Sequence, residues 1–87
     1  MPRHRKVFNY EQILAGSEPV RKAALRRLFA LNAATNLLDL RSPPANRLEK
    51  LRGARQGQFS IRVNEKWRIC LEWREGHAWN VEIVDYH

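Results

Sequence analysis

The three residues Asp85, Tyr86 and His87 at the end of the chain form a dense set of titratable groups. His87 has the side chain whose ordinary pKa lies nearest neutrality, so it is suited to donate or accept a proton. Tyr86 is suited to stack on a nucleic-acid base or to hydrogen-bond a phosphate. A terminal Tyr-His pair is also a common form of frayed chain end, and the residues alone leave both interpretations open.

Arginines supply the second candidate chemistry. The alternation described below pairs Arg62 with Arg68 on neighbouring strands, and like charges in such a pair destabilise a sheet by roughly 0.2 to 1 kcal/mol unless an anion lies between them. Phosphate is the expected anion, because the guanidinium fork suits its oxygens. The alternative is a solvated polar face on which Glu72 and Glu82 neutralise the arginines. A cation-rich segment leading into the first strand contains Arg47, Lys50, Arg52 and Arg55.

Several kinds of site have no signal in the sequence. There is no glycine-rich phosphate loop, no Cys/His zinc spacing and no carboxylate cluster suited to magnesium, and the one cysteine, Cys70, has no partner for an internal disulfide. We therefore expect chemistry that needs neither a metal nor another cofactor. RNA cleavage by attack of its own 2′-OH on the adjacent phosphate suits such a site, since it needs only a base, an acid and cations.

The first half of the chain predicts helix. Apolar residues recur at helical spacing from Glu18 to about Thr35, with Ser17 as the N-cap and Pro19 in the first turn. A shorter helix over 10–15 precedes it. Pro43 and Pro44 end the helical region and begin an irregular, cation-rich loop that runs to Gly57. The core face of the long helix is predicted to hold Val20, Ala24, Leu28, Leu31 and Thr35.

From Phe59 onward apolar and polar residues alternate, which predicts three antiparallel strands. Turns over 64–66 and 75–77 pair Ile61 with Ile69 and Trp73 with Trp79, so the apolar residues of all three strands share one face. Trp67, Trp73 and Trp79 are expected in its core, although aromatic residues near cations also stack on unpaired bases. The opposite face is expected to be open, and its residues are Ser60, Arg62, Arg68, Cys70, Glu72, Arg74, Asn80 and Glu82.

Composition sets the class of molecule. The chain has 87 residues, of which 44% are hydrophobic, and we expect a single α+β domain over 1–87 with N-terminal helices packed on one face of a small antiparallel sheet. The net charge of +7 favours polyanions such as nucleic acid, or acidic proteins. The basic N-terminus is not followed by an apolar run, so we expect no secretory signal, no membrane segment and a cytoplasmic location.

The runs Asn46 to Gly53, Gly57 to Asn64, Trp67 to Cys70 and Val81 to His87 resemble the HigB/GraT branch of the RelE/ParE toxin superfamily. The resemblance covers most of the chain. It implies a RelE/ParE-like fold, ribosome-dependent cleavage of mRNA, hence inhibition of translation by an endoribonuclease, and a helix-turn-helix antitoxin of the HigA type as partner.

The same resemblance implies roles for individual residues. Arg68, in the Trp-Arg-Ile strand, is expected to stabilise the scissile phosphate. The other expected catalytic residues are Lys50, Asp85, Tyr86 and His87. The expected RNA contacts are Arg47, Arg52, Arg55, Arg62 and Arg74. Some relatives carry His where this chain has Glu49, so the general base is left unassigned between Glu49 and other groups.

Two alternatives belong to other classes of protein. The fold also serves ParE-type toxins that inhibit a protein target such as DNA gyrase without enzymatic activity, and a basic domain of this size suits an RNA-binding regulator. A toxin that has lost its activity and is kept as a partner of its antitoxin is a third interpretation. Codon preference, dependence on the ribosome and the stoichiometry with an antitoxin are left open by the sequence.

Overall fold

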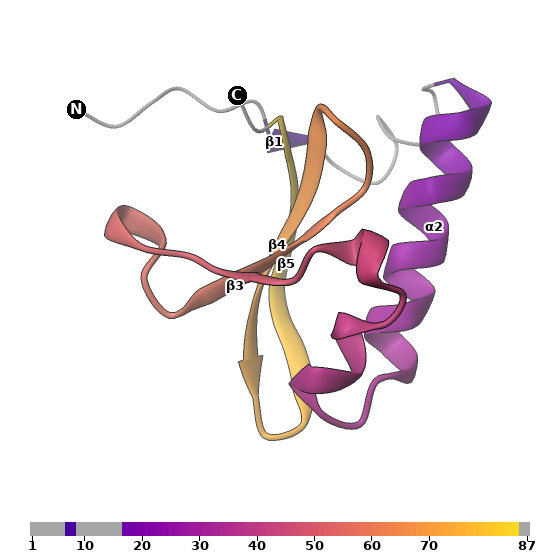
Figure 1. Ribbon diagram of the computed structural model, residues 1–87. Helices are drawn as coiled ribbons and strands as arrows, with labels where there is room; N and C mark the ends of the chain where they lie inside the picture. Colours follow the sequence, from indigo (N-terminus) through magenta and orange to yellow (C-terminus); the bar gives the residue numbers. More distant parts are fainter. Residues whose placement is uncertain (1–6, 9–16, 86–87) are drawn as a thin grey trace.

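The computed structural model describes residues 7–8 and 17–85, and it packs one helix against an antiparallel sheet (Figure 1). The helix is α2 (Glu18–Ala33), and the sheet order is β1-β5-β4-β3-β2. The strands are β1 (Val7–Phe8), β2 (Glu49–Lys50), β3 (Gln58–Arg62), β4 (Trp67–Arg74) and β5 (His77–Asp85). Three 3-10 turns connect α2 to β3, namely η1 (Leu37–Arg41), η2 (Pro44–Asn46) and η3 (Gly53–Arg55). The predicted α+β class is confirmed, whereas the predicted helix over 10–15 lies outside the described residues.

The start of α2 agrees with the prediction, and its end comes two residues early. Ser17 occupies the N-cap position, although its side chain makes no capping hydrogen bond. After Ala33 the chain turns because the Asp39 carboxylate accepts hydrogen bonds from the backbone of Thr35 (2.9 Å) and Asn36 (3.2 Å). These bonds lower the pKa of Asp39. Thr35, predicted on the core face of the helix, is therefore exposed and beyond its end.

The main core lies between α2 and the sheet. Ala24 and Leu31 of α2 are buried against branched residues of the three long strands, and Leu40 of η1 closes the core at the end of the helix. The buried strand residues are Ile61, Ile69, Leu71 and Ile83, and Val63, directly after β3, is buried with them. Trp67 and Trp73 are half-buried at its margin, which confirms their predicted structural role. Each fully buried Leu or Ile contributes about 1.5–3 kcal/mol, so this face dominates the stability of the fold.

The register of β3 with β4 is the predicted one. Ile61 pairs with Ile69, and Arg62 pairs with Arg68. The first hairpin closes where the Val63 and Asn64 amides donate to the Trp67 carbonyl at 2.9 and 3.3 Å. Two arginines are therefore direct neighbours across the strands, as the alternation of residues required.

The register of β4 with β5 differs from the prediction near the turn. The turn has two central residues, Glu75 and Gly76, with φ of 54° and 78°, so Trp73 pairs with Ala78 instead of Trp79. A bulge at Asn80 (φ 50°) adds a residue to β5, and the predicted register resumes where Cys70 pairs with Glu82. Ala78 thus takes the core position predicted for Trp79.

Trp79 is consequently exposed, at 43% of its surface. Val81 is 40% exposed for another reason, since it lines a hollow beside Leu28 and Leu31 of α2. Trp79 pairs with Glu72, which places it on the face of the sheet away from α2. The prediction that Trp79 belongs to the core is wrong, because a two-residue turn with positive φ at both central positions replaces the expected three-residue turn.

The turn yields a stability prediction. Gly76→Ala should lower the free energy of unfolding by about 1 kcal/mol, because an L side chain is strained at positive φ. An added Cβ would meet only the Thr35 carbonyl at 3.8 Å, so the cost is conformational and not steric. Glu75→Asn should act in the opposite direction, since Asn tolerates positive φ. Urea denaturation of both variants tests the turn, and a Gly76→Ala variant as stable as the parent protein would contradict it.

Candidate functional site

The face of the sheet away from α2 carries the predicted arginines, and it is only partly open. Residues 47–57, which we call the covering loop, lie across part of it. Leu51 of this loop is buried with Cys70 and Val84 in a second, small core. Ser60 and Cys70, predicted on an open face, are fully buried beneath the loop. The open-face prediction holds for Arg74 and Asn80, which are exposed, but it is wrong for Ser60 and Cys70, and Arg68 is largely covered.

Arg68 is held in place by groups from three segments. Its Nε donates to the Ser60 hydroxyl at 2.9 Å, and its Nη2 donates to the Arg47 carbonyl at 2.8 Å. The Glu49 carboxylate lies 3.7 Å from the same Nη2. Arg47 has a left-handed backbone (φ 45°), which turns the chain at the start of the covering loop. With a side chain only 11% exposed, Arg68 presents a fixed guanidinium rather than a mobile one.

A pocket of about 340 Å³ lies beside this guanidinium. Its lining residues are Arg47, Arg62, Asn64, Glu65 and Arg68. The lining residues include three arginines and one carboxylate, and Glu49 offsets part of the charge of Arg68 from outside the lining, so the balance is positive and favours an anion. The direct pairing of Arg62 with Arg68 makes an anion between them stabilising. The Arg62 end of β3 is tied to α2, because Arg27 Nε donates to the Arg62 carbonyl at 2.9 Å. Partial burial, and then the charge of Arg26, lower the pKa of Arg27.

Lys50 and Arg52 lie apart from this pocket. Both are exposed, and both line a separate hollow of about 360 Å³ with Leu51, Gly53 and Gln56. Lys50 pairs with Phe59, whereas Glu49 pairs with Ser60, so alternation directs Lys50 to the opposite side of β2 from Glu49 and Arg68. The structure therefore brings Lys50 and Arg52 together, but it does not bring Lys50 into the pocket of Arg68.

Asp85 is at the same end of the sheet as Arg68. It pairs with Trp67, one position beyond the pairing of Arg68 with Val84. Because Val84 belongs to the face of Arg68, alternation directs the Asp85 side chain toward the α2 face. Tyr86 and His87, the other predicted terminal residues, lie outside the described residues.

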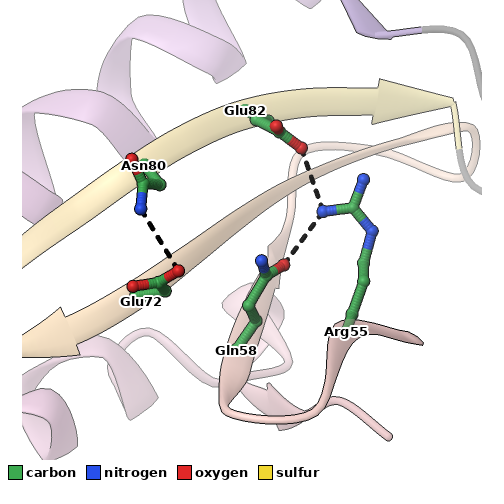
Figure 2. Close-up of polar contacts among 5 residues, drawn as sticks. All are labelled: Arg55, Gln58, Glu72, Asn80 and Glu82. Atoms are coloured by element: carbon green, nitrogen blue, oxygen red, sulfur yellow. Dashed lines mark hydrogen bonds and ion pairs between the residues drawn. The ribbon is translucent and has the colours of Figure 1, made fainter. Parts of the chain in front are cut away.

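The Arg55 side chain connects the covering loop to the sheet. Its Nη1 donates to Gln58 Oε1 at 2.9 Å and lies 2.9 Å from Glu82 Oε2 on β5, as Figure 2 shows. Only 19% of the Arg55 side chain is exposed. This guanidinium, predicted to contact RNA, is thus engaged in fastening η3 to the centre of the sheet. Arg74, the last predicted RNA contact, lies at the opposite end of β4 from Arg68.

Sequence reasoning did not find the groups that fix Arg68. Ser60 and Glu49 pair with each other across β2 and β3, and Ser60 also pairs with Cys70, two residues from Arg68. The alternation of β3 placed Ser60 correctly on this face, but β2 is too short to give a sequence signal. Asn64 and Glu65 line the pocket beside Arg68, whereas the sequence predicts them only as residues of a turn.

Neither a group of metal ligands nor a membrane-spanning helix is found among the described residues. Within residues 7–8 and 17–85, no three His, Cys, Asp or Glu side chains are grouped so that they could hold a metal ion. In the same ranges, none of the helices combines the length and the apolar character that crossing a bilayer requires.

Comparisons with known proteins identify the family of this chain. The family described as RelE-like toxin of type II toxin–antitoxin system HigB matches residues 4–87. Toxin HigB-1 of Vibrio cholerae is 44% identical over 64 residues, which are 74% of this chain and 67% of that protein. Endoribonuclease HigB of Proteus vulgaris is 36% identical over 61 residues, which are 70% of this chain and 65% of that protein. The matched segments thus span about two thirds of each relative's length.

A solved structure has the same fold. In the YoeB–YefM complex from Staphylococcus aureus, one chain superposes with a TM-score of 0.66 over 90% of this chain and 83% of that chain. The sequence identity is 18%, so the likeness concerns the arrangement of helix and sheet.

The ion pair of Arg55 with Glu82 gives a prediction about the covering loop. Arg55→Ala should make local opening of the loop easier by roughly 1 kcal/mol, which corresponds to about fivefold faster amide exchange there. Hydrogen exchange of the Leu51 amide, which donates to the Gln58 carbonyl at 2.9 Å, reports this opening. Arg52→Ala, in the same loop but exposed, is the matched control and should leave exchange unchanged. Equal exchange in both variants would show that Arg55 does not fasten the loop.

Proposed function

Because this chain belongs to the HigB family of RelE-like toxins from type II toxin–antitoxin systems, we propose that it is an endoribonuclease that cleaves mRNA on the ribosome. One observation carries the proposal: Arg68 is fixed beside Arg62 in a pocket whose charge favours an anion. The scissile phosphate is the anion that we assign to this pocket. The name of the Proteus vulgaris relative, an endoribonuclease, supports the same activity.

The proposed reaction needs no metal ion. The 2′-oxygen of the RNA attacks the adjacent phosphorus, its proton passes to a base, and the bond from phosphorus to the 5′-oxygen breaks as an acid protonates that oxygen. The products are a 2′,3′-cyclic phosphate and a 5′-OH. Negative charge grows on the phosphoryl oxygens in the transition state, and a guanidinium that is already positioned stabilises it without reorganisation. Arg68 supplies this stabilisation, and Arg62 adds a second positive charge.

The proton-transfer groups are proposed from the terminal residues and the covering loop. An arginine stays protonated, so neither Arg62 nor Arg68 serves as the base. Glu49 is a candidate base, since its carboxylate lies 3.7 Å from Arg68 Nη2. His87 is the proposed acid or base at the other position, and Tyr86 and Asp85 are the other terminal residues proposed to take part. Lys50 and Arg52, exposed in their own hollow, are proposed to contact phosphates outside the scissile one.

The proposed partners follow from the family. A type II system pairs its toxin with a protein antitoxin, and we propose a helix-turn-helix antitoxin of the HigA type for this chain. Action on translating ribosomes places the protein in the cytoplasm.

A translation reaction with purified ribosomes and a defined mRNA tests the proposal. The parent protein should cut the mRNA and leave 5′-OH ends, which polynucleotide kinase labels without prior phosphatase treatment. A 2′-deoxy nucleotide at the cut site should block cleavage, because the attacking oxygen is then missing. Arg68→Ala should lower the cleavage rate by roughly 100- to 1000-fold at any salt concentration, since it removes the group that stabilises the transition state.

Two further variants control this experiment. Arg26→Ala removes an exposed cation of α2 and should change cleavage only modestly and in a salt-dependent way. Arg68→Lys keeps the charge but loses the fork that bonds Ser60 and Arg47, and it should retain an intermediate rate. Circular dichroism checks that each variant is folded. Intact mRNA in a reaction in which translation or replication nevertheless stops would instead support a non-enzymatic inhibitor of a protein target.

A further inference from the structure

A pair formed by a tryptophan and an arginine, Trp79 and Arg74, lies at the far end of the face that carries Arg68. Arg68 and Arg74 are at opposite ends of β4, roughly 20 Å apart at the rise of an extended strand. Arg74 points to the same face as Arg68, and its guanidinium lies 4.7 Å from the ring centroid of Trp79. Trp79 is 43% exposed there. An exposed indole and an arginine thus lie on the same face of β4 as the proposed cleavage site, and the covering loop lies between the two places, over Cys70.

The pair is held by its own network of contacts. Trp79 Nε1 donates to the Arg74 carbonyl at 2.9 Å, which fixes the plane of the indole. Glu72 Oε2 lies 3.4 Å from Arg74 Nε, and Glu72 Oε1 accepts a hydrogen bond from Asn80 Nδ2 at 3.2 Å (Figure 2). One carboxylate therefore links the arginine to the bulge residue, so the aromatic surface is formed before any partner binds.

The backbone keeps Trp79 out of the core at a cost. With the core register at Ile69 and Ile83 kept, a three-residue turn and no bulge would place this large apolar side chain on the α2 face, where its burial would contribute a large hydrophobic stabilisation. The positive φ of Glu75 adds conformational strain, whereas Asn80 adopts the same region readily. Exposed indole surface next to a guanidinium is the arrangement on which proteins stack unpaired bases.

We propose that Trp79 and Arg74 form a second RNA-binding site, in which an unpaired base stacks on the indole and the guanidinium contacts the neighbouring phosphate. This proposal rests on the proposed function, because it assigns the site to the RNA whose phosphate is cleaved at Arg68. Between the two sites, Glu82 is paired with Arg55 of the covering loop, so its charge is offset and the RNA passes over the loop. Within the second site Glu72 contacts only Nε of Arg74, which leaves the other guanidinium nitrogens for a phosphate.

Binding of a 12-nucleotide, unstructured, fluorescently labelled RNA to the purified toxin tests the site. Trp79→Leu should weaken binding by roughly five- to hundredfold, the range that loss of one base-stacking contact produces. Trp79→Phe should retain most of the affinity, because it keeps an aromatic face. The matched control is Phe29→Leu, which removes an aromatic residue that is 72% exposed on α2, and it should bind like the parent protein.

The quenching of indole fluorescence by RNA is a second readout, and its measurement in the parent protein does not depend on the stability of any variant. An unlabelled RNA of the same sequence should quench the emission of the parent protein, and most of this quenching should be missing in Trp79→Leu, which retains Trp67 and Trp73. Absence of quenching in the parent protein at saturating RNA overturns the site, and so does equal affinity of Trp79→Leu and the parent.

The same preparations separate the two proposals. If the parent protein cuts mRNA on ribosomes while Trp79→Leu binds RNA and cuts mRNA equally well, the second site is wrong and the endoribonuclease assignment stands. If the parent binds RNA through Trp79 but leaves mRNA intact on ribosomes, the second site stands and the cleavage assignment is wrong.

Discussion

Arg62 and Arg68 are held side by side because the register of β3 with β4 is set on the other face of the sheet. Ile61 and Ile69 pair there beneath α2. A slip of one residue would turn these side chains outward, and each buried Ile or Leu is worth about 1.5–3 kcal/mol. The repulsion between two paired arginines costs only roughly 0.2 to 1 kcal/mol. The burial of apolar side chains therefore outweighs the repulsion between the arginines. It holds Arg62 and Arg68 close together, and the proposed activity depends on this arrangement of charge.

The covering loop converts this arrangement of charge into a site of fixed geometry. The Arg47 carbonyl and Glu49 approach Arg68 from the start of the loop, Leu51 buries its apolar side chain against Cys70 and Val84, and Arg55 reaches Glu82 across the sheet. Contacts of three different kinds thus fasten one short segment. The guanidinium of Arg68 is consequently oriented by the protein before a phosphate arrives, which is the condition under which electrostatic stabilisation of a transition state is most effective.

Strict alternation let the sequence predict the β3–β4 hairpin and the place of Arg68 on the far face. It did not predict the bulge at Asn80, because one extra residue in a strand reverses the alternation locally and resembles a longer turn. Nor did it predict that Arg55 is engaged with Glu82, since the two are 27 residues apart in sequence and only the fold brings them together. The sequence lists the cations of the covering loop, but it does not distinguish a cation that fastens the loop, such as Arg55, from one that faces solvent, such as Arg52.

The two ends of β4 differ in how their arginines are used. Arg68 is almost enclosed and is bonded to neighbouring segments, which suits a group that must meet one phosphate in one geometry. Arg74 is exposed over an indole that is itself exposed, which suits a looser contact that accepts any base. A ribonuclease that acts on many messages needs both properties. It needs strict geometry at the bond that breaks and tolerance of sequence elsewhere along the RNA. The proposed sites at the two ends of β4, with the covering loop between them, provide one property each.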